Sequence, residues 1–232
     1  MTERWKVYVT AGVQKAGGPI PFALAQWTFS LSVFLAIRRA VPAGGRVLDV
    51  GCGAGIFAAL LAHHGYRVVG VDDDPDIVTY AREMVAYLRA PAVVEQASAF
   101  DLARYHGQFD LVYSLGVLEH FEPAATVRLL QEQARCARFV VVVVPTRFAR
   151  YAAPVTDERL YTRRQLTTLA RHAGLRVRES FVYGDVPTRT ARALDRWVPK
   201  IAYRGLRECF SYGMDLCCVG ERPAAVDGAS PE

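Results

Sequence analysis

The sequence predicts an α/β fold in which a seven-stranded, mostly parallel sheet carries helices on both faces and includes an antiparallel strand near the C-terminus. Short β-branched runs alternate with helical patterns through the middle of the chain, which is typical of a parallel sheet covered by helices. One strand pattern also runs directly into a glycine-rich turn. The 232 residues, 52% apolar and 22% charged, can bury one substantial core and exclude disordered, collagen-like and coiled-coil proteins.

The first 45 residues are predicted to form N-terminal helices. The apolar stretch 22–37 contains four polar residues and is shorter than the ~20 residues that span a bilayer, so we expect a buried helix there. Residues 1–6 include Glu3 and Trp5 in place of the basic stretch of an export signal. The expected location is therefore cytoplasmic.

The cofactor-binding core is predicted to span residues 46–184. Residues 139–144 are so apolar that we expect a central strand covered on both faces. Helices are expected at 56–64, 76–88, 123–136 and 163–172, and strands at 46–50, 67–72, 92–96, 109–114, 139–144, 176–183 and 212–220. Residues 1–222 are predicted to form one domain, in which a lid is inserted at 185–211 and the last strand lies within 212–222. Residues 223–232 are predicted to form a disordered tail.

The distribution of charge and the number of cysteines indicate which kinds of site to expect. Residues 135–207 carry a net charge of +11 and the rest of the chain −6, which predicts one basic surface. The five cysteines are an odd number without CxxC spacing, so neither a metal site nor a disulfide framework is expected.

The most informative motif is the glycine-rich turn at residues 51–55, which follows the strand that contains Asp49. Glycines let the backbone approach a ligand at the carboxyl edge of the sheet. Asp49 is unfavourable beside a pyrophosphate, and Asp72 ends the next strand, where a carboxylate can accept both hydroxyls of a ribose. The pattern predicts a ligand with a ribose and no pyrophosphate, which disfavours a dinucleotide oxidoreductase.

These residues resemble the class I S-adenosylmethionine-dependent methyltransferases, which have a Rossmann-like fold, and the resemblance covers about residues 46–184. It implies S-adenosyl-L-methionine as cofactor and a backbone turn under its amino-acid part. It also implies that Asp49 lies near the ammonium group and that Asp72 holds the ribose. The cofactor-binding residues implied in this way are Asp49, Gly51, Cys52, Gly53, Gly55, Asp72, Asp73, Ser98, Ala99, Phe100, Leu115 and Gly116.

Two segments bear on how the cofactor is bound and on which substrates are expected. Ser98 stands where the family usually has the aspartate that binds the adenine amino group, and Ala99 and Phe100 are expected to wall the base. Residues 113–116 lack the prolines that base methyltransferases usually carry at this position. A nucleic-acid substrate is therefore disfavoured, and a small molecule is expected.

His120 is the candidate catalytic residue. Methyl transfer to a hydroxyl or amine requires removal of a proton, and imidazole titrates near neutrality. A role in capping the following helix or contacting the cofactor is an equal alternative. Glu119 is expected to be structural. Tyr161 and Tyr183 are the alternatives to His120 as the base.

The insertion is predicted to form two helices divided by Pro199. Basic residues recur there at helical spacing, namely Arg189, Arg192, Arg196, Lys200, Arg204 and Arg207, and leave Leu194, Trp197, Ile201 and Leu206 for the other side. A solvated basic face over a lid is the simplest interpretation. A membrane surface or an anionic substrate is the alternative.

The function predicted from these observations is methyl transfer from S-adenosylmethionine to an oxygen or nitrogen of a natural product or other metabolite. The alternatives are a quinone or lipid methyltransferase at a membrane surface, an RNA methyltransferase, and a partner subunit that binds the cofactor without catalysis. The sequence leaves the oligomeric state open.

Overall fold

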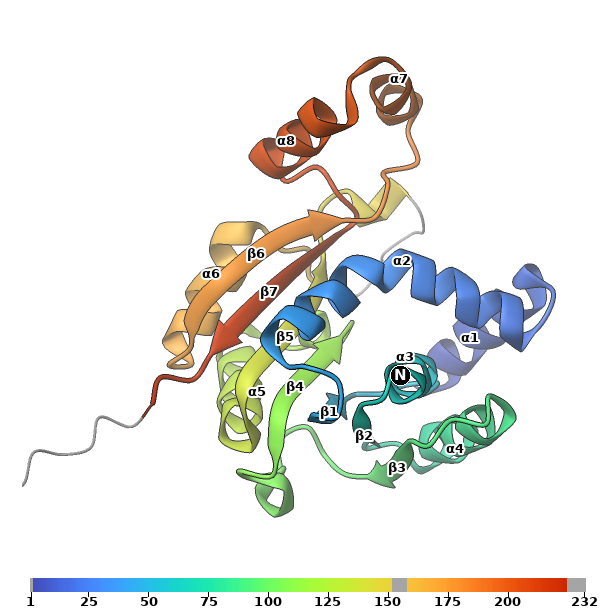
Figure 1. The fold of residues 1–232 in the computed structure, drawn as a ribbon, viewed down its shortest axis with the longest axis vertical. Helices are drawn as coiled ribbons and strands as arrows, with labels where there is room; N and C mark the ends of the chain where they lie inside the picture. Colours follow the sequence, from blue (N-terminus) through green and yellow to red (C-terminus); the bar gives the residue numbers. More distant parts are fainter. Residues whose placement is uncertain (1, 152–157, 225–232) are drawn as a thin grey trace, which may run out of the picture.

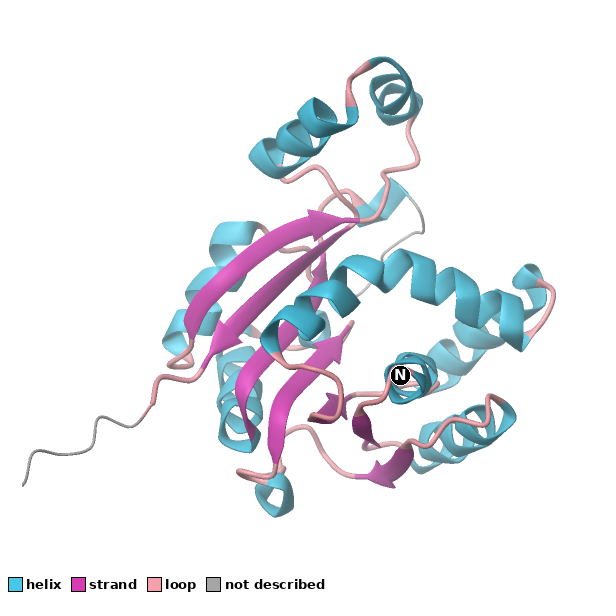
Figure 2. Cartoon of the chain, viewed as in Figure 1, coloured by secondary structure: helices cyan, strands magenta, loops and turns pink. Residues whose placement is uncertain are grey.

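The computed structural model describes residues 2–151 and 158–224, and the predicted disorder of residues 225–232 lies outside this part. Its sheet has seven strands in the order β3-β2-β1-β4-β5-β7-β6, with helices on both faces (Figures 1 and 2). The predicted fold class is therefore confirmed. The strands are β1 (Arg46–Val50), β2 (Arg67–Asp72), β3 (Val93–Gln96), β4 (Phe109–Leu115), β5 (Ala137–Pro145), β6 (Arg176–Tyr183) and β7 (Asp215–Glu221).

Strand direction determines which residues meet at the functional edge of the sheet. Strands β1 to β5 are parallel, and β7 pairs antiparallel with both β5 and β6. Strand β6 consequently runs in the same direction as β5, and the start of β7 lies beside the carboxyl ends of both. Parallel α/β sheets bind ligands at this edge.

The helices form two layers because each buries one apolar side against the sheet. Helices α2 and α3 cover one face with a shared core, and α5 and α6 cover the other. The bounds are α1 (Thr2–Ala16), α2 (Pro19–Ala40), α3 (Ile56–His63), α4 (Pro75–Tyr87), α5 (Pro123–Cys136) and α6 (Arg163–His172), with short 3₁₀ turns η1 (Ala103–Tyr105), η2 (Leu118–His120) and η3 (Ala149–Tyr151).

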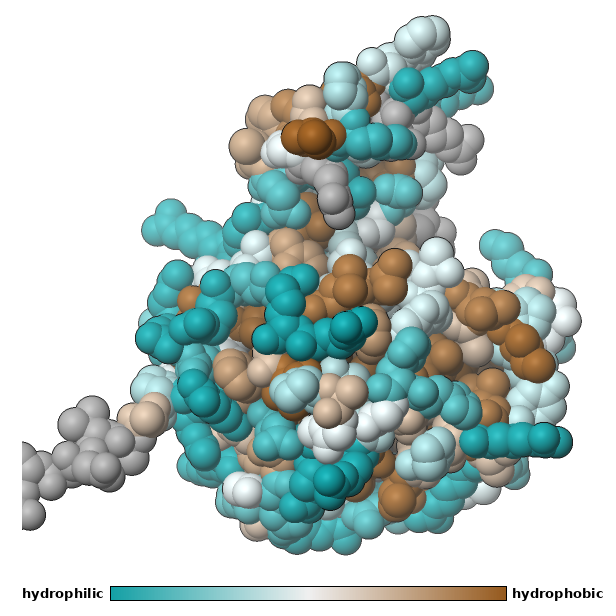
Figure 3. All heavy atoms as spheres, viewed as in Figure 1, coloured by the Kyte–Doolittle hydropathy of each residue, from teal (hydrophilic) through white to brown (hydrophobic). Residues whose placement is uncertain are grey.

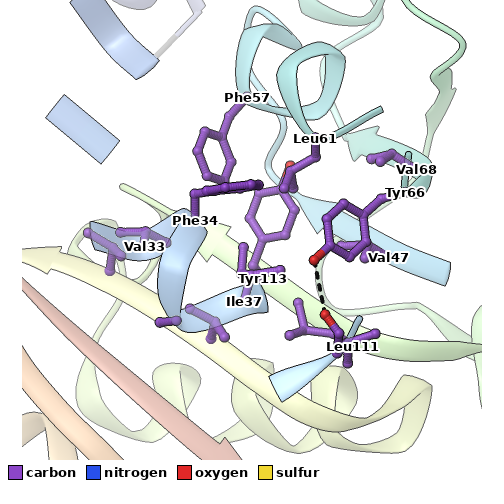
Figure 4. Packing of buried hydrophobic residues seen from close by; sticks show 14 of the residues in the cluster. Val33, Phe34, Ile37, Val47, Phe57, Leu61, Tyr66, Val68, Leu111 and Tyr113 are labelled. Carbon is purple, nitrogen blue, oxygen red and sulfur yellow. Dashed lines mark hydrogen bonds between the residues drawn. The ribbon is translucent and has the colours of Figure 1, made fainter. Parts of the chain in front are cut away.

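The larger core joins α2 and α3 to the middle of the sheet (Figure 4). The Phe57 ring packs edge-on against Tyr113 at 5.3 Å, and Phe34 of α2 lies in the same cluster. The Tyr66 hydroxyl donates a hydrogen bond of 2.9 Å to the Val41 carbonyl, which satisfies a polar group inside this apolar layer. These contacts bury the inner side of α2, but Leu24, Leu31 and Leu35 on its outer side are exposed, so the predicted buried helix is only partly correct.

The last strand begins three residues later than predicted, at Asp215 instead of residue 212. Residue Ser211 has a left-handed backbone, with φ of 48°, and the Tyr212 N–H donates to the Arg207 carbonyl. The Arg207 side chain in turn donates to the Tyr212 carbonyl at 3.1 Å. Tyr212 is therefore held as part of the preceding helix end and is unavailable to the sheet.

The insertion consists of α7 (Arg189–Trp197) and α8 (Lys200–Phe210), with Pro199 at the start of α8. The predicted division of its faces is wrong at α8. Arg207 faces the body of the protein, where it pairs with Asp185 at 3.0 Å, whereas Trp197, Ile201 and Leu206 are exposed. The side chains of Arg192, Leu194 and Arg204 lie outside the described residues.

Candidate functional site

The glycine-rich turn after β1 requires glycine for two physical reasons. Gly51, Gly53 and Gly55 have φ angles of 71°, 52° and 68°, which side chains disfavour. A Cβ on Gly51 would also lie 2.5 Å from Cγ2 of Val117, in the loop after β4. The turn is fixed to the next strand because the N–H groups of Gly51 and Cys52 both donate to the Val71 carbonyl. The turn after β1 and the loop after β4 are thereby brought into contact.

Asp72 lies at the end of β2 and faces this turn. Its Oδ2 accepts the Gly53 N–H at 3.1 Å, and its Oδ1 accepts the Asp74 N–H at 3.3 Å. Burial raises the pKa of Asp72, while the two N–H donors oppose that shift. Asp74 is occupied as the N-terminal cap of α4, and the Asp73 side chain is exposed. Of the three consecutive aspartates, Asp72 therefore lies closest to the turn.

Asp49 and Tyr113 form a buried pair beneath the turn. They are neighbours in the parallel register of β1 and β4, so their side chains emerge on the same face. Burial, opposed by the Tyr113 hydroxyl and aided by the nearby charge of Asp72, raises the pKa of Asp49 to about 7. Among the described residues, the Tyr113 hydroxyl lies against Asp49 without a hydrogen bond of normal geometry. Such an unsatisfied buried group is costly unless a ligand completes it.

The electrostatics of this region favour a cationic ligand. Two carboxyl groups, Asp49 and Asp72, are close enough for their charges to interact unfavourably. A bound positive charge would relieve that repulsion, whereas a pyrophosphate would increase it. Cys52 does not alter this balance, because burial raises the pKa of its thiol and keeps it neutral.

The loop after β3 reaches the same edge. Ser98 is half-buried, and its hydroxyl accepts the Phe100 N–H at 3.3 Å. Phe100 packs edge-on against Phe121 at 5.1 Å, and Arg128 lies over its ring. Ala99 is packed between two core clusters. Ser98 is placed at the edge as the sequence predicted, while the Phe100 ring contacts the segment after η2.

The end of β4 brings the next candidate residues beside the turn. Leu115 ends the strand, and the Gly116 N–H donates to the Val143 carbonyl at 3.1 Å. His120 ends the short turn η2, and its side chain is exposed at this edge. The structure thus brings all twelve predicted cofactor residues and His120 to the carboxyl edge of the sheet, although it places Asp73 and Phe100 toward solvent.

A second set of ionisable residues lies at the same edge, between β4, β6 and β7. Glu119 is buried, and burial raises its pKa to about 8 with help from the charges of Glu158 and Asp215. Its Oε2 has no hydrogen-bond partner among the described residues. Burial raises the pKa of Asp215 to about 7, and the neighbouring hydroxyl of Tyr183 opposes this shift.

Sequence reasoning missed Asp215 and assigned Glu119 a structural role. Strand pairing explains the omission, since Asp215 is opposite both Pro145 and Tyr183, which are remote in sequence. The only sequence signal was an acidic residue directly before the apolar run 216–219 of the last strand. Tyr161 and Tyr183, the alternative bases, have pKa values raised by burial.

The first half of this edge lies within a segment that matches a known protein family. Residues 47–138 match the family model described as a methyltransferase domain. The ubiquinone biosynthesis O-methyltransferases of Aromatoleum aromaticum and Thiobacillus denitrificans are 38% and 40% identical to the chain over 105 and 104 residues. These matches cover 44% of the chain and 42% of each relative. The similarity therefore spans less than half the length of these relatives.

Solved structures show the same fold over most of the chain. The magnesium protoporphyrin IX methyltransferase of Synechocystis, solved with bound SAH, has a TM-score of 0.62 at 16% identity. That alignment covers 88% of the chain and 86% of the neighbour. The [4+2]-cyclase SpnF also has a TM-score of 0.62, at 22% identity, covering 86% and 82%. Because one of these neighbours is named a cyclase, the fold does not by itself define the reaction.

Proposed function

We propose that the chain is a class I S-adenosylmethionine-dependent methyltransferase that transfers the methyl group to a hydroxyl of a small organic molecule, since residues 47–138 match a methyltransferase domain and the fold is shared over most of the chain. The observation that carries this proposal is the pair of carboxyl groups at a glycine-rich turn, namely the buried Asp49 and the half-buried Asp72. This pair suits a ligand with a positive charge and a ribose.

The residues of the turn fit S-adenosylmethionine in three respects. The unsatisfied Tyr113 hydroxyl and the buried Asp49 provide polar groups near the position expected for an ammonium group. Asp72 supplies a carboxylate for the ribose hydroxyls, and Ser98 a hydroxyl for the adenine amino group. The glycines adopt the positive φ angles that let the backbone turn tightly and approach a ligand. When bound, this cofactor supplies an electrophilic methyl group on a sulfonium sulfur.

Glu119 and Asp215 are the proposed acceptor-binding residues. A purely structural carboxyl group at this depth would have its oxygens satisfied, and Oε2 of Glu119 is not. Their raised pKa values allow each group to accept or donate a hydrogen bond near neutral pH. We assign them the role of orienting the acceptor hydroxyl, since alignment supplies much of the rate of an in-line displacement.

His120 is the proposed base for the acceptor hydroxyl proton. It is exposed at the edge that carries the turn, only one residue from Glu119. Burial raises the pKa of Tyr161 and Tyr183 and makes their ionisation near pH 7 unfavourable. Histidine, by contrast, is the side chain that most often serves as a general base.

The names of the relatives favour oxygen over nitrogen as the acceptor atom and a ring compound as its carrier. They are named ubiquinone biosynthesis O-methyltransferases, so a quinone precursor is the first acceptor to test. The acidic residues at the acceptor side can accept hydrogen bonds from such a hydroxyl group. A phenol or catechol is therefore the proposed class of acceptor.

The test combines binding with product analysis. Calorimetric titration of the purified chain should show binding of S-adenosylmethionine and none of nicotinamide dinucleotides. Mass spectrometry should then detect a mass gain of one methyl group on a catechol and none on an aromatic amine or on RNA. Dinucleotide binding without a response to S-adenosylmethionine would overturn the proposal. Cofactor binding without transfer to any acceptor class would favour a non-catalytic partner subunit.

A further inference from the structure

The outer side of helix α2 presents an apolar stripe to solvent. Ile20, Leu24, Leu31 and Leu35 recur at helical spacing and are 55%, 58%, 43% and 43% exposed. Among the described residues, Pro19–Ala40 is the one helix long and apolar enough to cross a membrane by length and composition. Its opposite side is packed in the core, where Phe34 and Ile37 are buried (Figure 4). The helix therefore cannot leave the fold to span a bilayer without exposing that core.

The insertion presents a second apolar stripe, on helix α8 and the end of α7. Trp197 and Ile201 are 79% and 88% exposed, and Phe210 is 69% exposed. Besides Lys200, the described exposed positions on α8 are Ile201, Ala202, Gly205, Leu206, Cys209 and Phe210, which spread over about half of the helix circumference. Its other side faces the protein, where Tyr203 is buried and Arg207 is bonded to the Gly184 carbonyl.

The start of the α2 stripe and the insertion both lie toward the carboxyl edge of the sheet. The start of α2 packs on the glycine-rich turn through Phe22, Ala23, Ala54 and Ile56. The insertion leaves the sheet after Tyr183 and returns at Asp215, at the same edge (Figure 1). Figure 3 shows apolar side chains gathered over α2 and over α8 in one view. Exposed apolar side chains that gather on one part of the surface mark interaction sites, whereas singly scattered ones do not.

Basic side chains accompany both stripes. Arg38, near the end of α2, is exposed, and Arg189, Arg196 and Lys200 are exposed on the insertion. An apolar helix side flanked by basic residues is typical of helices that lie in the plane of a membrane surface. Acidic headgroups would be attracted by these cations, whereas a second copy of this basic region would be repelled.

We propose that α2 and the α7–α8 insertion form a membrane-binding surface that inserts its apolar side chains into an anionic lipid bilayer. This surface orients the carboxyl edge of the sheet toward the lipid. An acceptor dissolved in the bilayer would then reach Glu119 and His120 without crossing water. The membrane contact itself is independent of the methyl-transfer reaction.

The experiment is co-sedimentation of the full chain with vesicles, with no cofactor or acceptor present. Vesicles of phosphatidylglycerol mixed with phosphatidylcholine should retain the protein, and raising the salt from about 0.1 M to about 0.5 M should weaken retention. The double variant Leu24→Asp, Ile201→Asp should lower the partition coefficient at least about tenfold, since two apolar contacts are replaced by charges that anionic lipids repel.

Matched controls use exposed apolar residues elsewhere. Tyr87 and Val93 are 59% and 52% exposed on α4 and β3, so Tyr87→Asp and Val93→Asp should leave retention unchanged. Failure of the wild-type chain to sediment with anionic vesicles, or equal retention of the double variant, would overturn the proposal. A concentration-dependent dimer that Leu24→Asp dissociates would overturn it too, because the surface would then bind a second copy.

Discussion

Buried carboxyl groups at the two edges of the sheet have pKa values shifted in opposite directions. At the amino edge, Glu221 is bonded to the guanidinium groups of Arg138 and Arg176, and these arginines lower its pKa to about 2. At the carboxyl edge, Asp49, Glu119 and Asp215 have pKa values raised by burial, and none has an arginine partner among the described residues.

This difference separates residues that stabilise the fold from residues that await a ligand. A carboxylate with arginine partners is satisfied in the free protein, so its ion pairs contribute to folding. A buried carboxyl group without such partners costs stability, and folding alone does not explain its presence. The contrast assigns function to the carboxyl edge on physical grounds, independently of any motif.

The largest expected effect concerns His120. Replacing His120 by alanine should lower turnover about 10²- to 10⁴-fold, the range for loss of a general base, while affinity for S-adenosylmethionine stays unchanged. The measurement is steady-state turnover with a calorimetric affinity. His106 is a matched control near the amino edge, bonded to Glu132 at 3.1 Å, and His106→Ala should keep activity. A loss of affinity equal to the loss of turnover would instead show a binding role.

The next prediction concerns the free energy of unfolding. Replacing a carboxyl group by an amide should change it with opposite signs at the two edges. Because the folded-state pKa of Asp49 is raised to about 7, its contribution to stability is complete below pH 4 and is lost as pH rises through 7. Asp49→Asn should therefore raise the free energy of unfolding at pH 8 by about 2 to 4 kcal/mol and change it little at pH 4.

Glu221 provides the opposite case in the same denaturation experiment. Its lowered pKa means that its contribution is present above about pH 4.5 and is lost as pH falls toward 2. Glu221→Gln should therefore lower the free energy of unfolding at neutral pH. Destabilisation by both substitutions at pH 8 would contradict the distinction between the two edges.

Cofactor affinity should depend on Asp72. The Asp72→Ala variant should bind S-adenosylmethionine about 10- to 100-fold more weakly, which corresponds to about 1 to 3 kcal/mol for an unpaired buried polar group. Isothermal titration calorimetry measures this change. Glu83 is an exposed acid on the neighbouring helix α4, and Glu83→Gln should bind with unchanged affinity. Equal weakening by both substitutions would indicate a general charge effect.

The smallest effect is the pH dependence of cofactor affinity. An ionised Asp49 is required opposite a cationic ligand, so affinity should fall about tenfold between pH 7 and pH 5.5, as the group takes up a proton. The same titration with Asp49→Asn should lose this dependence. A wild-type affinity that stays constant over the range would show that Asp49 does not face the ligand's charge.

The sequence by itself determined the sheet, most element bounds and the cofactor edge. Hydrophobic periodicity is local, and so is the run from β1 into Gly51, so both could be recognised without the fold. The carboxyl ends of parallel strands share one edge, and for this reason the strand pattern alone places Asp49 and Asp72 together.

Only the tertiary structure decided the acceptor side and the outer surface. Asp215 and Glu119 lie close because β7 inserts between β5 and β6, and the distance in sequence between the two residues conceals this proximity. The periodicity of α2 and α8 indicates an apolar stripe, but it cannot say whether the stripe meets the core or solvent. That outcome depends on packing with distant elements, which left Ile20, Leu24 and Ile201 exposed.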